Sequence, residues 1–150
     1  MVADMKPDVL IMASAENTLQ RLASGAEGEA AAAEYEAGMR RGLEDLKPSA
    51  ASVVVLSKPP MGQNLQTCVT KVSKPADCAT TVTNEWRAFT GSERTATGAR
   101  YVDTQLWVCN TSGRCPAFVG ATPIRVDSGH LTIQYAESLA HVMRTTLLAG

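Results

Sequence analysis

The sequence predicts an α/β fold with a parallel sheet, and the order of its apolar segments carries this prediction. Two short apolar runs, at residues 8–13 and 52–57, have the continuous hydrophobicity of strands that are buried on both faces. The long segment between them is rich in Ala and Glu, which favours a helix. Strands that alternate with helices in this way are typical of layered folds in which the strands run parallel.

The segment between the two apolar runs is predicted to be a helix over residues 26–46. Its large apolar side chains recur every three or four residues, which places them on one stripe of a helix. The members of this stripe are Tyr35, Met39, Leu43 and Leu46. Pro48 marks the end of the helix. The opening letters MVADMK resemble the end of a further helix ahead of the first strand.

Weaker signals follow in the second half of the chain. Residues 80–93 are predicted to be helical, with Val82, Trp86 and Phe89 on one side. Residues 99–103 are predicted to form a third short strand. The two stretches that flank these elements, 61–78 and 107–119, have no clear periodicity and are expected to be loops.

The C-terminal segment is predicted to be one amphipathic helix over residues 131–148. Its apolar face consists of Tyr135, Leu139, Val142 or Met143, and Leu147. The sheet then has only three strands, and the first of them has the character of a central strand. We therefore expect residues 1–150 to form one partial domain that lacks strands on its N-terminal side. The exposed sheet edge of such a domain could pair two copies of the chain.

The overall charge gives no reason to expect a nucleic-acid partner. The formal net charge is −1, and 45% of the residues are hydrophobic. No apolar run approaches the roughly 20 residues that cross a bilayer. Charged residues and a proline interrupt the start of the chain, where a signal peptide needs an apolar stretch. The sequence as given is therefore expected to hold neither a signal peptide nor a transmembrane segment.

Four cysteines form two sequence-local pairs, and they point to export. Cys68 is close to Cys78, Cys109 is close to Cys115, and neither pair has the CxxC spacing of redox or zinc motifs. Two local disulfides would each stabilise the fold by roughly 2–3 kcal/mol and would require an oxidising compartment. The alternative is four unpaired thiols in a cytosolic protein.

The two histidines differ in setting. His141 lies within the predicted last helix, where a partly buried packing role is expected. On one helix it would stand about 16 Å from His130, which is too far for the two to share a metal ion. We expect no metal site and no cofactor.

His130 instead belongs to a polar turn, RVDSGH, directly before the helix. Asp127 precedes it by three residues, so the carboxylate can fold back onto one ring nitrogen. The other nitrogen would then be available as a base toward a serine hydroxyl. The alternative is that Asp127 caps the following helix and His130 is an ordinary surface residue. The spacing alone leaves both interpretations open.

The block Asp127-Ser-Gly-His130-Leu-Thr, followed by a helix with Tyr135-Ala136, resembles the last block of SGNH (GDSL-like) hydrolases. It is most similar to the extracytoplasmic SGNH domain fused to membrane O-acyltransferases of the acyltransferase-three family. Those proteins transfer acetyl or other acyl groups to cell-surface sugars. Residues 6–12 and 52–60 resemble two strand segments of that domain, and the cysteine pairs lie where it carries cysteines.

The resemblance implies a flavodoxin-like, three-layer α/β/α fold with Asp127 as the triad acid and His130 as the general base. The nucleophile of the family lies in a Gly-Asp-Ser block, which this sequence lacks. Asn17 is a candidate for the oxyanion Asn, although its flanking residues do not match the Gly-x-Asn-Asp pattern. Ser14 follows a strand but lacks the flanking Gly-Asp, so it is interpreted as a loop serine.

The resemblance therefore implies the C-terminal portion of a serine-type O-acyltransferase or esterase that acts on acyl esters of cell-surface glycans. Its substrate would be an acylated glycan or acyl donor, its partner a membrane acyltransferase domain, and its location extracytoplasmic. Without the nucleophile, the chain alone is expected to be inactive. One alternative is a non-catalytic, disulfide-stapled, exported binding module of the same fold. Another is a cytosolic α/β protein with incidental similarity.

Overall fold

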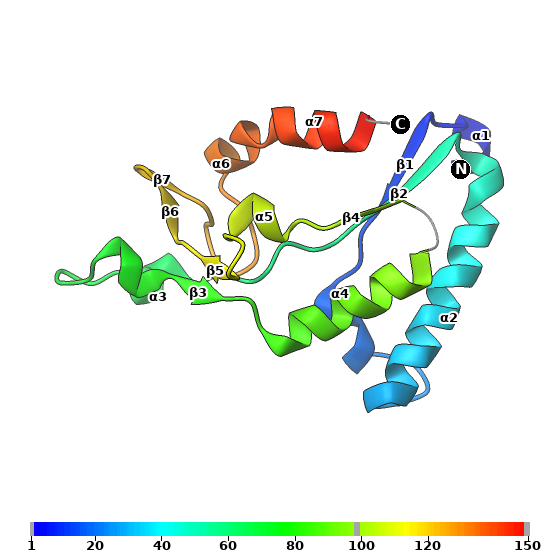
Figure 1. Ribbon diagram of the computed structural model, residues 1–150, viewed down its shortest axis with the longest axis horizontal. Coiled ribbons are helices and arrows are strands. Elements are labelled where there is room, and N and C mark those ends of the chain that lie inside the picture. The colour runs from blue at the N-terminus through cyan, green and yellow to red at the C-terminus, as the bar shows by residue number, and fades with distance from the viewer. Residues whose placement is uncertain (1, 98–99, 149–150) are drawn as a thin grey trace. The chain divides into compact units, whose positions relative to one another are not determined.

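The computed structural model describes residues 2–97 and 100–148, and the chain forms two compact units (Figure 1). The first unit comprises Met1–Lys58 and Asn84–Asp103. The second unit comprises Pro59–Thr83 and Thr104–Gly150. The chain therefore leaves the first unit after the second strand, returns to it for a helix and a strand, and ends in the second unit.

A three-stranded parallel sheet in the order β1–β2–β4 forms the centre of the first unit (Figure 1). Its elements are α1 (Val2–Met5), β1 (Val9–Met12), η1 (Glu16–Gln20), α2 (Gly28–Leu46), η2 (Lys47–Ser49), β2 (Ser52–Leu56), α4 (Asn84–Thr97) and β4 (Arg100–Val102). In the register of the sheet, Val53 of β2 lies opposite Leu10, and Val55 lies opposite Tyr101. The predicted α/β class with a parallel sheet is confirmed.

Helices α2 and α4 supply the side chains that pack on one face of this sheet. Val53 and Val55 are two residues apart on β2 and therefore point to the same face. The core around them also contains the predicted stripe of α2 and two residues of α4. These further members are Tyr35, Met39, Leu43, Phe89 and Ala96. The apolar stripe predicted for α2 is thus the side of the helix that the core buries, with Leu46 half-buried at its end.

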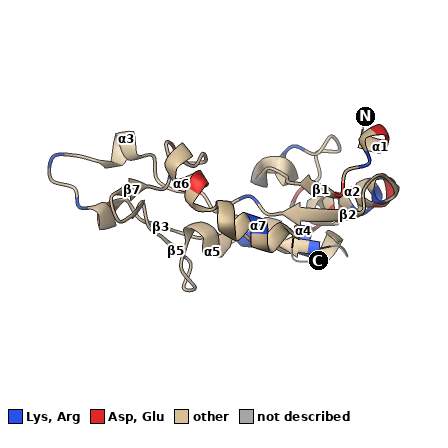
Figure 2. Ribbon diagram, turned by 90° about the horizontal axis from the view of Figure 1, so that it is seen from above, with Lys and Arg blue, Asp and Glu red and all other residues tan. Residues whose placement is uncertain are grey.

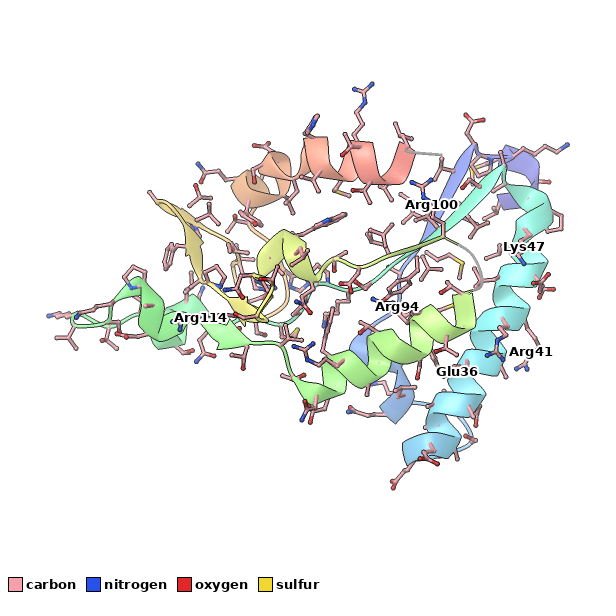
Figure 3. All side chains as sticks on the ribbon, viewed as in Figure 1. Glu36, Arg41, Lys47, Arg94, Arg100 and Arg114 are labelled. Carbon is pink, nitrogen blue, oxygen red and sulfur yellow. A yellow bond between two sulfur atoms is a disulfide. The ribbon has the colours of Figure 1, made fainter. Side chains whose placement is uncertain are left out.

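The outer side of α2 carries charges of both signs (Figures 2 and 3). Arg40 and Glu36 form an ion pair of 3.5 Å, one helical turn apart. Lys47 and Glu44 form a second pair of 2.6 Å near the end of the helix. Exposed pairs of this kind contribute less than about 1 kcal/mol each, so the apolar stripe of α2 is what holds the helix in place.

A buried polar cluster links α2, α4, β4 and the segment that follows β1. Glu93 of α4 is completely buried. Its Oε1 lies 3.3 Å from the Tyr35 hydroxyl, and its Oε2 lies 3.4 Å from the Tyr101 hydroxyl. The Tyr35 hydroxyl also lies 3.0 Å from Ser14 Oγ. Burial raises the pKa of Glu93 to about 7, although these hydroxyl groups stabilise the charged form and lower the pKa in part.

The second unit contains short elements and two antiparallel strand pairs, β3 with β5 and β6 with β7. Its elements are α3 (Leu65–Cys68), η3 (Pro75–Cys78), β3 (Thr80–Thr81), α5 (Gln105–Val108), β5 (Arg114–Cys115), β6 (Phe118–Val119), β7 (Thr122–Pro123), α6 (Ile133–Ser138) and α7 (Ala140–Leu148). Disulfides join Cys68 to Cys78 and Cys109 to Cys115, the two pairings expected from the sequence. Cys78 lies just before β3 and Cys115 lies in β5, so both disulfides brace the same strand pair.

The predicted helix at 80–93 is displaced in the structure. Residues Thr80–Thr81 form β3, whereas α4 begins at Asn84 and continues to Thr97. Val82, which was predicted to lie on the apolar side of the helix, precedes it and donates its backbone N–H to Gly113 O at 2.8 Å. The reason is that Thr and Val favour extended backbone, and β5 offers the partner strand. Trp86 and Phe89 are buried on α4 as predicted.

The predicted C-terminal helix is divided in two. Helix α6 ends at Ser138, and α7 begins at Ala140. The Ser138 hydroxyl donates to Tyr135 O at 2.6 Å, and such a side-chain bond back to the preceding turn competes with regular helix geometry. Leu139 lies at the break and is buried, so the apolar face continues across it.

The third strand predicted at 99–103 is found as Arg100–Val102, and residue 99 lies outside the described residues. Within the described part of the chain, no helix is both long enough and apolar enough to cross a membrane.

We predict that Glu93→Gln removes a pH-dependent loss of stability. The folded pKa near 7 lies above the usual 4.5, so the folded state binds more protons than the unfolded state between these values. The free energy of unfolding should therefore fall as the pH rises through this window, by about 3 kcal/mol. Below this pH window the carboxyl is neutral in both the folded and the unfolded state, so this loss of stability is absent.

Urea unfolding at several pH values measures this effect. The control is Glu85→Gln, which changes an exposed carboxylate on the same helix and should keep the pH dependence of the native chain. An equally steep pH dependence in Glu93→Gln would contradict the assignment of the buried charge.

Candidate functional site

The Asp127/His130 turn closes a narrow hairpin in the second unit. The backbone N–H of Val126 donates to His130 O at 3.0 Å, and the N–H of Thr132 donates to Ile124 O at 3.0 Å. These bonds fix both arms of the hairpin with main-chain groups. The position of the turn therefore does not depend on the side chains that it presents.

The Asp127 carboxylate makes three hydrogen bonds within its own turn. Its Oδ1 accepts from the backbone N–H groups of Gly129 (2.7 Å) and His130 (2.8 Å). Its Oδ2 lies 2.8 Å from Nδ1 of the His130 ring. The backbone N–H of His130, then its ring, and then the N–H of Gly129 lower the pKa of Asp127 to about 2. The carboxylate is thus oriented by the main chain and remains ionised in neutral solution.

The His130 ring is held at one nitrogen and open at the other. Its side chain is 83% exposed. Because the ionised Asp127 accepts at Nδ1, a neutral ring carries its proton there and presents the lone pair of Nε2 to solvent. The alternative role for Asp127, as the cap of the next helix, belongs to a different residue. Thr132 caps α6, since its hydroxyl accepts from the N–H of Tyr135.

The other residues singled out from the sequence lie elsewhere. Asn17 is half-buried on η1 in the first unit. Ser14, also in the first unit, is half-buried beside the Tyr35 hydroxyl. His141 is exposed on α7, so the expectation that it is partly buried was wrong. Asp127 and His130 are therefore the two predicted residues that the structure brings into hydrogen-bond contact.

Metal chemistry has no candidate among the described residues. No group of three or more His, Cys, Asp and Glu side chains is arranged there to hold an ion.

The support beneath the turn includes a buried arginine that sequence patterns did not predict. Arg125 is buried, with 5% of its surface exposed, and its guanidinium Nη2 donates to Pro60 O. The N–H of Gly62 donates to Ser128 O at 2.8 Å. Arg125 lies between two apolar residues of the hairpin, and both this alternation of polar and apolar side chains and its charge favour an exposed position. Sequence patterns therefore predict that Arg125 is exposed, whereas the structure buries it.

The parallel α/β sheet and the Asp-x-x-His turn before the last helices are the features expected of an SGNH domain. The model of the family described as "SGNH domain (fused to AT3 domains)" matches residues 1–145. The chain belongs to this family. No curated protein matches it.

A solved structure shares the fold. The chain is similar to the periplasmic domain of the lipopolysaccharide acetyltransferase of Salmonella ser. Paratyphi A, with a TM-score of 0.65 and 19% sequence identity. The match covers 98% of this chain and 59% of the other, so the chain spans 59% of the length of that structure. At this identity the likeness establishes the fold, which agrees with the SGNH-like fold implied by the sequence.

We predict that Asp127 titrates near pH 2, well below the usual 3.8, because the turn stabilises its charged form. Its contribution to the stability of the turn should persist above pH 3.8 and disappear as the pH falls through about 2. Carbon-13 NMR of the carboxyl group measures the midpoint. In His130→Ala the midpoint should rise only part of the way, because the backbone N–H of residue 130 remains. A return to the ordinary value in that variant would assign the effect to the ring alone.

Proposed function

We propose that this chain supplies the acid and the general base of a serine acyl-transfer site in an extracytoplasmic SGNH domain. The domain would work with a membrane acyltransferase domain and act on acyl esters of cell-surface glycans. The observation that carries this proposal is the 2.8 Å contact between Asp127 Oδ2 and His130 Nδ1 on an exposed, main-chain-braced turn.

The geometry suits His130 to proton transfer. Asp127 holds the proton on Nδ1, so Nε2 accepts the proton of the serine hydroxyl as its oxygen attacks the acyl carbonyl. The imidazolium that forms is stabilised by the ionised Asp127, and it returns the proton to the leaving group of the donor. The acyl-serine ester is then cleaved by a sugar hydroxyl or by water, with His130 again acting as the base.

The serine comes, in this proposal, from outside the 150 residues. The sequence has no Gly-Asp-Ser block, and the hydroxyl of Ser14 lies against Tyr35 in the buried cluster of the first unit. The oxyanion would be held by backbone N–H groups or by an Asn, for which Asn17 is the candidate in this chain.

Three observations support an extracytoplasmic location. Both cysteine pairs form disulfides, which persist in oxidising compartments. The structure that shares the fold is described as a periplasmic domain, and the family is described as fused to AT3 domains. These observations also suit the second candidate function, an exported binding module without chemistry, and the missing Gly-Asp-Ser block favours that alternative. The braced Asp127/His130 pair favours catalysis.

We predict that the 150-residue chain alone does not hydrolyse p-nitrophenyl acetate above background, because it lacks the nucleophile. The release of p-nitrophenol should be equal for the native chain and for His130→Ala. Hydrolysis by the native chain that disappears in His130→Ala would instead place the serine within these residues.

We also predict that His130→Ala, introduced in the gene in its own host, lowers glycan acylation by about 10²–10⁴-fold in rate, the usual contribution of a general base. Asp127→Asn should cause a loss of similar size, because the amide favours the wrong ring tautomer. Ester-linked acyl groups on isolated glycans measure the effect. The matched control is His141→Ala, which removes the exposed histidine of α7. Unchanged acylation in His130→Ala, with the protein present at normal levels, would favour the binding module.

A further inference from the structure

We propose that Arg125 is a positioning residue, which clamps the Asp127/His130 turn to the 59–62 segment from within the second unit. The clamp consists of two hydrogen bonds between the hairpin and this segment. Arg125 Nη2 donates to Pro60 O, and the N–H of Gly62 donates to Ser128 O at 2.8 Å. Together they hold the hairpin two residues before Asp127 and one residue after it.

Arg125 occupies a position that costs stability. Its residue surface is 5% exposed, and its Nε has no hydrogen-bond partner among the described residues. Burial lowers the pKa of its guanidinium, since the charged form loses water. Among the described residues no carboxylate forms an ion pair with Arg125, and a buried charge without such a partner is less favourable than an apolar side chain of the same volume. An arginine here is therefore explained by its bond to Pro60 O and not by its contribution to the core.

Gly62 shows how closely the two segments approach. A Cβ at this position would lie 2.6 Å from Arg125 Cδ and 3.0 Å from its Nε. Any side chain at residue 62 would therefore push Arg125 away from Pro60. The glycine is required here because of the close approach of the arginine stem.

The 59–62 segment is itself anchored, so it can serve as the fixed side of the clamp. Met61 O accepts from the Thr80 hydroxyl at 3.2 Å. Thr80 begins β3, which pairs with the disulfide-bonded Cys115 of β5. The clamp thus connects the Asp127/His130 turn to the most strongly cross-linked part of the second unit.

A ligand site at Arg125 is excluded by space. The cavity that Arg125 and Gly62 line has a volume of about 10 Å³, which is at the lower limit for a single water. No phosphate or carboxylate ligand fits there. The guanidinium therefore acts on the protein's own main chain.

The effect on the turn is testable without substrate. The consequence for catalysis rests on the proposed function, whereas the state of the His130 ring does not. Nitrogen-15 NMR of the histidine rings in the disulfide-bonded chain, at a pH at which the imidazole is neutral, reports which ring nitrogen carries the proton. In the native chain the Nδ1–H tautomer should dominate at His130, because Asp127 accepts there. His141 provides an internal reference in the same spectrum.

Arg125→Met, which keeps the apolar stem and removes the charge, should shift the tautomer ratio of His130 by about tenfold or more toward Nε2–H. Gly62→Ala should shift it in the same direction, and Arg125→Lys, which keeps a donor, should restore part of the native ratio. The matched control is Arg114→Met on β5 (Figure 3), since the guanidinium of Arg114 also donates to a main-chain oxygen, Ala76 O at 3.5 Å, but is exposed. This control should leave the ratio unchanged.

The native ratio in a folded Arg125→Met variant would overturn the proposal. If that variant fails to fold, the tautomer ratios of His130 in Gly62→Ala and Arg125→Lys test the proposal instead. Native ratios in both variants would overturn the proposal as well. A native chain without a dominant Nδ1–H tautomer would contradict the Asp127/His130 pair itself, and with it the proposed function. A third outcome is that Arg125→Met loses the Nδ1–H tautomer of His130 while glycan acylation in the host is unchanged. This result would support the clamp and would contradict only the proposed function.

Discussion

The two disulfides are the constraint on which the second unit depends. Its strands are two residues long, and most of its helices have one turn, so regular hydrogen bonding cannot hold it together. Cross-links on both sides of the β3–β5 pair supply the missing order, because they remove conformations from the unfolded chain. From this point, hydrogen bonds run through Thr80 to the 59–62 segment and then to the hairpin that carries Asp127.

The first unit is stabilised in a different way. Its parallel sheet buries Val53 and Val55 under α2 and α4, and the hydrophobic effect needs no cross-link there. It nevertheless contains a fully buried carboxyl group, Glu93, among tyrosine hydroxyls. The two units thus share one feature, which is a charged residue kept in the interior and bonded to neutral groups. In the second unit that residue is Arg125.

The candidate site combines a carboxylate and an imidazole in hydrogen-bond contact with a sequence that has no Gly-Asp-Ser block. Asp127 is oriented by two main-chain N–H groups of its own turn, and hydrogen bonds to the 59–62 segment hold the hairpin that presents them. A general base without a nucleophile has no reaction of its own, which is why the proposed function assigns the serine to a segment outside this sequence.

The sequence by itself determined the features that depend on neighbouring residues. Periodicity located α2 and its buried stripe, apolar runs located β1 and β2, and the DSGH letters located the Asp127/His130 pair, since each of these depends on contacts within a few residues. Local rules failed where tertiary contacts compete with them. Thr80–Thr81 became a strand because β5 lies beside them, and α6 ended where Ser138 bonds back to its own helix. Only the tertiary structure placed Arg125 and Glu93 in the interior, because burial of a charge is decided by which distant segments supply its hydrogen bonds.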